Sequence, residues 1–202
     1  MATYFDNIQR SYTDVPITSE GIETMPFLEA TEGVVKLFDL LNSKAFTVVQ
    51  NDMNGNILKI RNRYNTDPKK NITLEKLVIN EKDEKKRIAT EGLMWLKRGL
   101  EFTSVALRRS LESSKSANGA EELSVSFTKA YEDTLKKFHG MLVRPVFKMA
   151  MSCCPYRKDF FEKLGEDQEK VYRQFEEWLV SFEKVVEILN NFYKEGGHDK
   201  GF

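Results

Sequence analysis

Apolar residues recur along most of this chain at steps of three and four positions. Such steps place the apolar side chains on one face of a helix, whereas a half-buried strand would alternate apolar and polar residues. No window reads as a strand. Four windows predict amphipathic helices, near residues 49–64, 93–111, 127–149 and 171–192.

Local signals suggest where helices begin and end. A first helix is predicted to open with Thr24 as N-cap and Pro26 in its first turn, and to stop near Asn42. Pro145 lies inside the 127–149 pattern and is expected to kink or end that helix. The stretch SSKSANGAEE (113–122) is typical of a flexible surface loop.

These signals predict one all-α domain of about eight helices over residues 21–195. Residues 1–20 lack periodicity, so we expect a loosely packed N-terminal segment. Residues 196–202, which include His198, are expected to form a disordered tail.

Charge and composition exclude several classes of protein. The 202 residues carry 31 Lys+Arg and 31 Asp+Glu, and this zero net charge argues against nucleic-acid binding and a polybasic membrane anchor. No run of about 18 apolar residues is present, and the first residues lack the apolar core of a signal peptide. The adjacent Cys153 and Cys154 fit a reducing compartment, so we expect a cytoplasmic protein.

The sequence offers little catalytic chemistry. There are two histidines and no nucleophile elbow, phosphate-binding loop, dinucleotide fingerprint or zinc-protease motif. The cysteines lack a second Cys/His pair at zinc spacing, so no metal or cofactor is expected. A pairing of His139 with one of the cysteines stays open on spacing alone, although no signature supports it. We therefore do not expect an enzyme.

One polar stripe stands out. Asp52, Asn56 and Lys59 are spaced at i, i+4 and i+7, next to an apolar stripe of the same predicted helix. Acid, amide and ammonium together offer acceptors and donors, which suits sugar hydroxyls. An ordinary solvent-exposed face is the competing interpretation.

Trp95 and His139 also have two interpretations each. Trp95 is either a core residue or a platform on which a sugar ring stacks. His139 is either a satisfied core residue or a hydrogen-bond partner for a ligand amide. Several predicted helices are apolar on more than one stripe, which indicates either a large core or a site for a long apolar ligand.

Taken together, these segments resemble the glycolipid transfer protein family. The resemblance runs from about residue 20 to residue 195, and its motifs occur in the family's order. The matching stretches are PFLEA (26–30), Asp52 through Asn56 and Lys59 to Ile60, LMWLKRGL (93–100), KAYEDTLKKFHG (129–140) and PYRKDF (155–160).

The resemblance implies a two-layer helical sandwich with an apolar tunnel for ceramide chains. It implies that Asp52, Asn56 and Lys59 bind the first sugar and the ceramide amide, that Trp95 stacks on the sugar, and that His139 bonds the amide carbonyl. A related branch that carries ceramide-1-phosphate has cationic residues at the positions of Asn56 and Trp95. An amide and an indole at these positions favour an uncharged sugar.

The implied activity is non-enzymatic transfer of glycosphingolipids by a monomer that docks transiently on membranes. Exposing around 30 ceramide methylenes to water costs on the order of 20 kcal/mol, which such a carrier avoids. Met141 stands where animal members have a docking tryptophan, and Leu142 and Tyr156, with Phe147, are further candidate membrane contacts. A glycosphingolipid sensor or adaptor, or a ceramide-1-phosphate carrier, remains an alternative.

Overall fold

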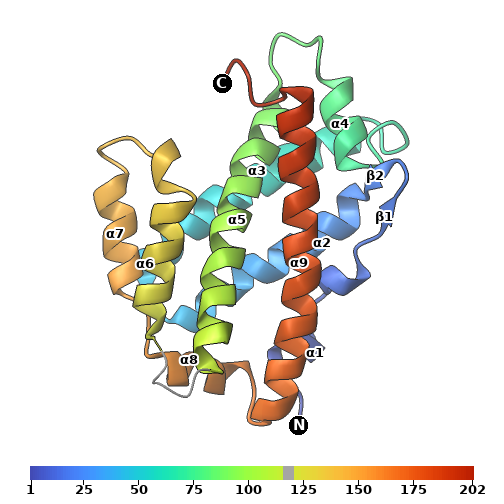
Figure 1. Ribbon diagram of the computed structural model, residues 1–202. Coiled ribbons are helices and arrows are strands. Elements are labelled where there is room, and N and C mark those ends of the chain that lie inside the picture. Colours follow the sequence, from blue (N-terminus) through green and yellow to red (C-terminus); the bar gives the residue numbers. More distant parts are fainter. Residues whose placement is uncertain (116–120) are drawn as a thin grey trace.

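Long amphipathic helices cross in two layers in the computed structural model, which describes residues 1–115 and 121–202. Within those ranges the nine α-helices are α1 (Tyr4–Asn7), α2 (Thr24–Leu37), α3 (Thr47–Thr66), α4 (Leu74–Asn80), α5 (Ile88–Ser114), α6 (Leu123–Asp133), α7 (Arg144–Ser152), α8 (Arg157–Leu164) and α9 (Gln168–Gly196). Helices α6, α5 and α9 run side by side in one layer, and α2 and α3 cross behind them (Figure 1). The expected all-α class is confirmed.

Short elements link the long helices. They are the 3-10 helices η1 (Tyr12–Asp14), η2 (Phe38–Leu41), η3 (Lys44–Phe46) and η4 (Lys136–Phe138), and the strands β1 (Ile17–Thr18) and β2 (Gly21–Ile22). The two strands form an antiparallel hairpin, with Thr18 paired to Gly21. Periodicity could not predict this hairpin, because each strand has only two residues.

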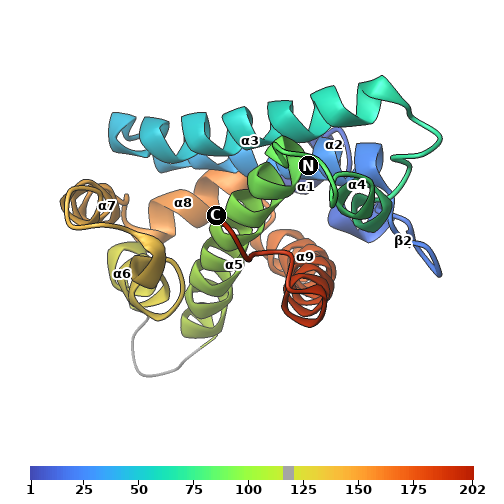
Figure 2. The same ribbon diagram turned by 90° about the horizontal axis from the view of Figure 1, so that it is seen from above.

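Helix α5 is the centre of the molecule and packs against α3, α6 and α9; the view from above shows α3 lying across it (Figure 2). The α3–α5 crossing depends on Gly92, which is buried. A Cβ added at Gly92 would lie 3.1 Å from Cβ of Lys59 and 3.4 Å from the carbonyl oxygen of Asn56. The absent side chain therefore lets the two helices approach closely. In the described part of the chain, no helix is long and apolar enough to cross a bilayer.

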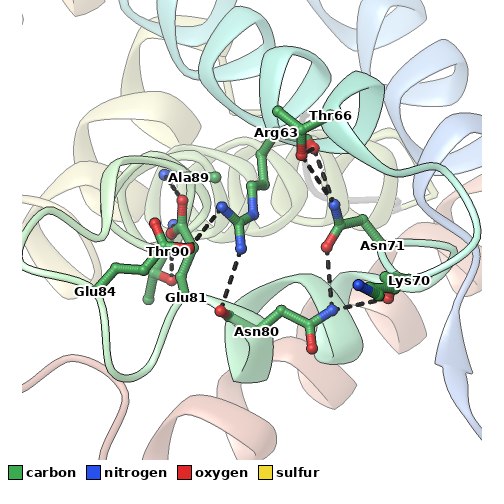
Figure 3. Close-up of polar contacts among 9 residues, drawn as sticks. All are labelled: Arg63, Thr66, Lys70, Asn71, Asn80, Glu81, Glu84, Ala89 and Thr90. Carbon is green, nitrogen blue, oxygen red and sulfur yellow. Dashed lines mark hydrogen bonds and ion pairs between the residues drawn. The ribbon is translucent and has the colours of Figure 1, made fainter.

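A polar cluster fixes the ends of α3 and α4 against the start of α5 (Figure 3). The buried carboxylate of Glu81 accepts hydrogen bonds from the backbone nitrogens of Ala89 (3.1 Å) and Thr90 (2.7 Å) and from the Thr90 hydroxyl (2.8 Å). It thereby satisfies N–H groups that the first turn of α5 cannot pair internally. Arg63 extends the cluster by donating to the carbonyl oxygen of Asn80 (3.2 Å) and pairing with Glu84 (2.8 Å).

The N-terminal segment is packed, so the expectation of a loose segment is wrong for its aromatic residues. Thr3 caps α1 with its hydroxyl, and the ring of Phe5 lies 5.5 Å from that of Phe175. Tyr12 is buried, stacks on Phe182 at 4.5 Å, and shares a hydrogen bond with a threonine of α2. A few aromatic anchors on α9 hold the segment without any repeat in the sequence.

Two predicted helix boundaries need correction. Thr24 is not an N-cap, since Glu23 holds that place and the Thr24 hydroxyl donates to the carbonyl oxygen of Asn71 (2.8 Å). The 127–149 window is not one helix kinked by Pro145. Helix α6 ends at Asp133, and Pro145 lies in the first turn of the separate helix α7, where its missing N–H costs little. The predicted stop at Asn42 is confirmed, because this residue caps η2 with a positive φ of 51°.

The C-terminal tail folds back on the molecule, which contradicts the expected disorder. The ring of His198 lies 4.5 Å from that of Phe192, and Arg87 donates to the carbonyl oxygen of Lys200 (2.6 Å) while lying over the ring of Phe202. In the predicted loop 113–122, residues 113 and 114 belong to α5, and residues 116–120 lie outside the described residues.

Candidate functional site

A cavity of about 360 Å³ lies between α3, α5 and the segment from Leu135 to α7. One part of its wall is polar and comprises Asp52, Asn56, Lys59, Glu91, Trp95 and His139. The other part is apolar and includes Val49, Met53, Phe102, Leu135, Val143 and Phe147. The cavity therefore suits an amphipathic ligand, with a polar group at one end and hydrocarbon at the other.

The polar stripe of α3 forms a hydrogen-bonded ladder. The amide nitrogen of Asn56 donates to Oδ2 of Asp52 at 3.3 Å, and Nζ of Lys59 donates to the amide oxygen of Asn56 at 3.2 Å. Asn56 is only 3% exposed, whereas Asp52 lies on the exposed rim. The ladder thus fixes the buried amide and presents a carboxylate and an ammonium at its two ends.

The electrostatics of the rim place two opposing influences on Asp52. Neighbouring side chains exclude water from its carboxylate and raise its pKa, while the positive charge of Lys59 lowers it, and the desolvation is the larger effect. A partly desolvated carboxylate gains more from a hydrogen-bond donor than a fully hydrated one.

Trp95 faces the ladder from α5. The Arg98 guanidinium lies 4.7 Å from the centre of the Trp95 ring and 3.8 Å from that of Phe138, so it fills the space between the two rings. The preceding residue, Lys97, extends toward α9 instead. It is 9% exposed and donates to the side-chain oxygen of Asn190 at 2.9 Å. Arg98 therefore holds the indole in place, while Lys97 belongs to the contact between α5 and α9.

His139 caps η4 and is half-buried at the other side of the cavity. Its Nδ1 lies 3.1 Å from the hydroxyl of Tyr131, and its ring centre lies 4.4 Å from that of Phe147 and 6.5 Å from that of Trp95. Burial and, to a lesser degree, the charge of Arg144 lower the pKa of His139, so the imidazole is neutral near pH 7.

Known proteins are similar to this chain in both sequence and fold. The family model described as glycolipid transfer protein matches residues 22–166. The chain belongs to this family. A glycolipid transfer protein of Aureobasidium melanogenum is 51% identical over 190 residues, covering 94% of this chain and 92% of the relative.

Two solved structures of the glycolipid transfer protein family share the fold. The fungal protein HET-C2 superimposes with a TM-score of 0.89 at 45% identity, over 95% of this chain and 97% of that one. A structure describing how FAPP2 selects simple glycosphingolipids has a TM-score of 0.86 at 30% identity, over 98% of both chains. The expected two-layer glycolipid-transfer fold is confirmed.

All five residues predicted for the site, Asp52, Asn56, Lys59, Trp95 and His139, line the one cavity. Glu91 was not predicted, although it also lines the cavity and stands one helical turn before Trp95. The i, i+4 spacing of Glu91 and Trp95, which places both on one face of a helix, could have indicated its position. Tyr131, the hydrogen-bond partner of His139, was not predicted either, because the contact depends on how η4 folds back onto α6.

The predicted membrane contacts do not line the cavity. Met141, Leu142 and Tyr156 are 85%, 91% and 72% exposed, which is unusual for side chains of this size. Phe147 is 7% exposed and belongs to the cavity wall, so its suggested role as a membrane contact is wrong.

Glycolipid transfer proteins are carriers and not enzymes, and the state of Cys154 is consistent with that. Burial raises the pKa of Cys154 to about 12, which leaves almost no thiolate at neutral pH. A nucleophilic pair of His139 with Cys154 therefore finds no support.

Proposed function

We propose that this protein carries glycosphingolipids between membranes, with the sugar held by Asp52, Asn56, Lys59 and Trp95. The observation that carries the proposal is the cavity in which a polar ladder and an indole meet an apolar wall. Family membership supports the same activity.

The headgroup is an uncharged sugar in this proposal. The carboxylate of Asp52 accepts hydrogen bonds from sugar hydroxyls, and the ammonium of Lys59 donates to them. The apolar C–H face of the sugar packs on Trp95, whose indole is held in place by Arg98. A lipid without the sugar leaves these partly desolvated groups unpaired, so it binds less tightly.

The ceramide amide is held by Asp52 and His139. When the hydroxyl of Tyr131 donates to Nδ1, the neutral imidazole carries its proton on Nε2 and donates it to the amide carbonyl. The carboxylate of Asp52 accepts the amide N–H. One chain supplies every group required, so we propose a monomeric carrier.

The hydrocarbon chains occupy the apolar end of the cavity. Its volume of about 360 Å³ lies near the lower limit for a ligand pocket and is small for a two-chain lipid. Chain uptake therefore displaces wall side chains, and the displacement falls on the α7 side, because α7 packs mainly against α6 and η3. Burial of the hydrocarbon against this wall compensates for the apolar environment that the lipid loses when it leaves the bilayer.

The exposed residues Met141, Leu142 and Tyr156 make the transient membrane contact. Together they offer apolar side chains and a phenol, which suits the boundary between headgroups and hydrocarbon. Met141→Asp is expected to slow transfer several-fold without changing glycolipid affinity in detergent, and Val180→Asp, which changes an exposed apolar residue of α9, is expected to leave the rate unchanged. Equal rates for Met141→Asp and wild type would contradict the assigned contact.

Transfer of fluorescent galactosylceramide between vesicles tests the proposal, with labelled ceramide-1-phosphate and phosphatidylcholine measured alongside. Wild type is expected to move the glycolipid selectively. Asp52→Val should abolish transfer while circular dichroism shows an intact helical fold, and Asp83→Val, an exposed aspartate outside the cavity, should transfer normally. Selective movement of ceramide-1-phosphate would reassign the headgroup, and retained transfer by Asp52→Val would overturn the site.

A further inference from the structure

A second cavity, of about 460 Å³, lies between α6 and α7. Its wall includes Tyr131 and Lys136 from the α6 side, Arg144, Lys148 and Met151 from α7, and Glu132. The residues proposed to bind the glycolipid headgroup do not line it.

Two stacked rings separate this cavity from the glycolipid site. Tyr131 lines the second cavity and Phe147 lines the first, and their ring centres are 5.3 Å apart with an angle of 13° between the planes. A ligand in the second cavity is therefore a different molecule, or a different lipid, from the one carried.

The charge of this wall is unbalanced. Lys136 pairs with Glu132 at 3.2 Å, which neutralises both. Arg144 uses only Nε, which donates to the carbonyl oxygen of His139 at 2.9 Å. In the described ranges, no carboxylate forms an ion pair with Arg144 or with Lys148. Two cations one helical turn apart thus face one groove in a chain whose net charge is zero.

The surroundings of the groove indicate where an anionic ligand comes from. Val146 and Met149, on the same helix as both cations, are 45% and 65% exposed, and Met141 and Leu142 lie just before Val143, the N-cap of this helix. Exposed apolar residues next to unpaired cations match the surface of a bilayer, where phosphate groups lie just above hydrocarbon.

We propose that Arg144 and Lys148 bind the phosphate of an anionic glycerophospholipid in the membrane on which the protein docks. The ligand chemistry is that of a phosphate ester, which a guanidinium and an ammonium recognise together. The proposal rests on the membrane contact in the proposed function. It gives that contact a preference for anionic bilayers, which the net charge of the whole chain would not produce.

Vesicle sedimentation without any glycolipid tests this site. Wild type is expected to bind vesicles containing phosphatidic acid more tightly than vesicles of phosphatidylcholine alone. Lys148→Gln should reduce binding to the anionic vesicles about fivefold, the effect of one cation at an anionic surface, and leave binding to phosphatidylcholine unchanged. Lys184→Gln removes the same charge from an exposed position on α9 and should change neither. Lys148 is the first choice because Arg144 also holds the backbone of His139.

The outcomes separate the proposal from its alternatives. If Lys148→Gln and Lys184→Gln reduced binding to the anionic vesicles equally, the proposal would be overturned, since net charge alone would then explain the preference for anionic vesicles. Competition by millimolar glycerol 3-phosphate at the same strength in wild type and Lys148→Gln would also overturn it. Galactosylceramide transfer from phosphatidylcholine vesicles, measured in parallel, should be normal for Lys148→Gln. If wild type itself transferred no galactosylceramide, the carrier function would be refuted. The sedimentation result would still report on the phosphate site.

Discussion

The phenolic oxygen of Tyr131 lies 3.1 Å from Nδ1 of His139, and this contact lies beside the ring wall that separates the two cavities. Tyr131 is 3% exposed, so no solvent competes for its hydroxyl. The contact selects the imidazole nitrogen that remains free for a ligand. Orientation of His139 thus depends on a residue that is not itself in the glycolipid site.

Tyr131→Phe tests this dependence. The variant keeps the ring that stacks on Phe147 and loses only the hydroxyl, so we expect the fold to persist and glycosphingolipid affinity to fall about fivefold, the effect of one hydrogen bond. Titration of intrinsic fluorescence with the lipid measures the affinity. Tyr12→Phe removes a buried hydrogen bond to Thr31 far from the cavity and should lower stability without changing affinity. Unchanged affinity in Tyr131→Phe would contradict the idea that the Tyr131 hydroxyl orients His139 for the lipid.

Acid should weaken the fold through His139. Burial and Arg144 hold its pKa below the ordinary value of 6.5 in the folded protein, so the unfolded chain takes up this proton first as the pH falls. The contribution of His139 to the free energy of unfolding should therefore be constant above that value and decrease below it. Urea denaturation at about pH 7.5 and about pH 5.5 measures the difference. His139→Gln should lose less stability over this interval than wild type, and identical losses would contradict the assignment.

Trp95→Ala should weaken glycosphingolipid binding by about 1 kcal/mol or more, because the sugar loses its aromatic contact. Isothermal titration with a short-chain glycolipid measures the affinity. Phe138→Ala is the matched control, since Phe138 also stacks on Arg98 but does not line the cavity. If Trp95→Ala and Phe138→Ala bound the glycolipid with the same affinity, the contact of Trp95 with Arg98 would be its only role.

The buried carboxylate of Glu81 should be important for stability. Glu81→Ala leaves two buried backbone N–H groups and a hydroxyl without partners, so the free energy of unfolding should fall by about 2–4 kcal/mol. Glu84→Ala removes a carboxylate from the same cluster, but its ion pair with Arg63 is at the surface, and the loss should be under about 1 kcal/mol. Urea denaturation distinguishes the two, and equal losses would contradict the capping role.

Long helices could be predicted from the sequence because each buries a continuous stripe. The windows near residues 49–64, 93–111 and 171–192 each lie within one helix, α3, α5 and α9 respectively. The prediction of one helix over residues 127–149 was wrong, because spacing does not detect a break between two helices that face the same core. Phe127 on α6 and Phe147 on α7 are both buried, so the repeat continues across the gap.

The site could be predicted only in part. Spacing placed Asp52, Asn56 and Lys59 on one stripe of a helix, because that relation is local. Their proximity to Trp95 and His139 arises from the crossing of α3 over α5 and the fold of η4, and it was expected from the family resemblance alone. The anchored N-terminal segment and the two cations of α7, Arg144 and Lys148, carry no repeat or motif that sequence reasoning would recognise.

Gly92 has a bearing on how this protein can change over evolutionary time. The spacing between the ladder of α3 and the indole of α5 is set where Gly92 meets Lys59, and a single methyl group there would press on that lysine. In the proposed site, the space for a sugar between the two helices thus depends on a residue that has no side chain to touch the sugar. A substitution at residue 92 would therefore change the packing of α3 on α5 and the sugar selectivity of the proposed site at the same time.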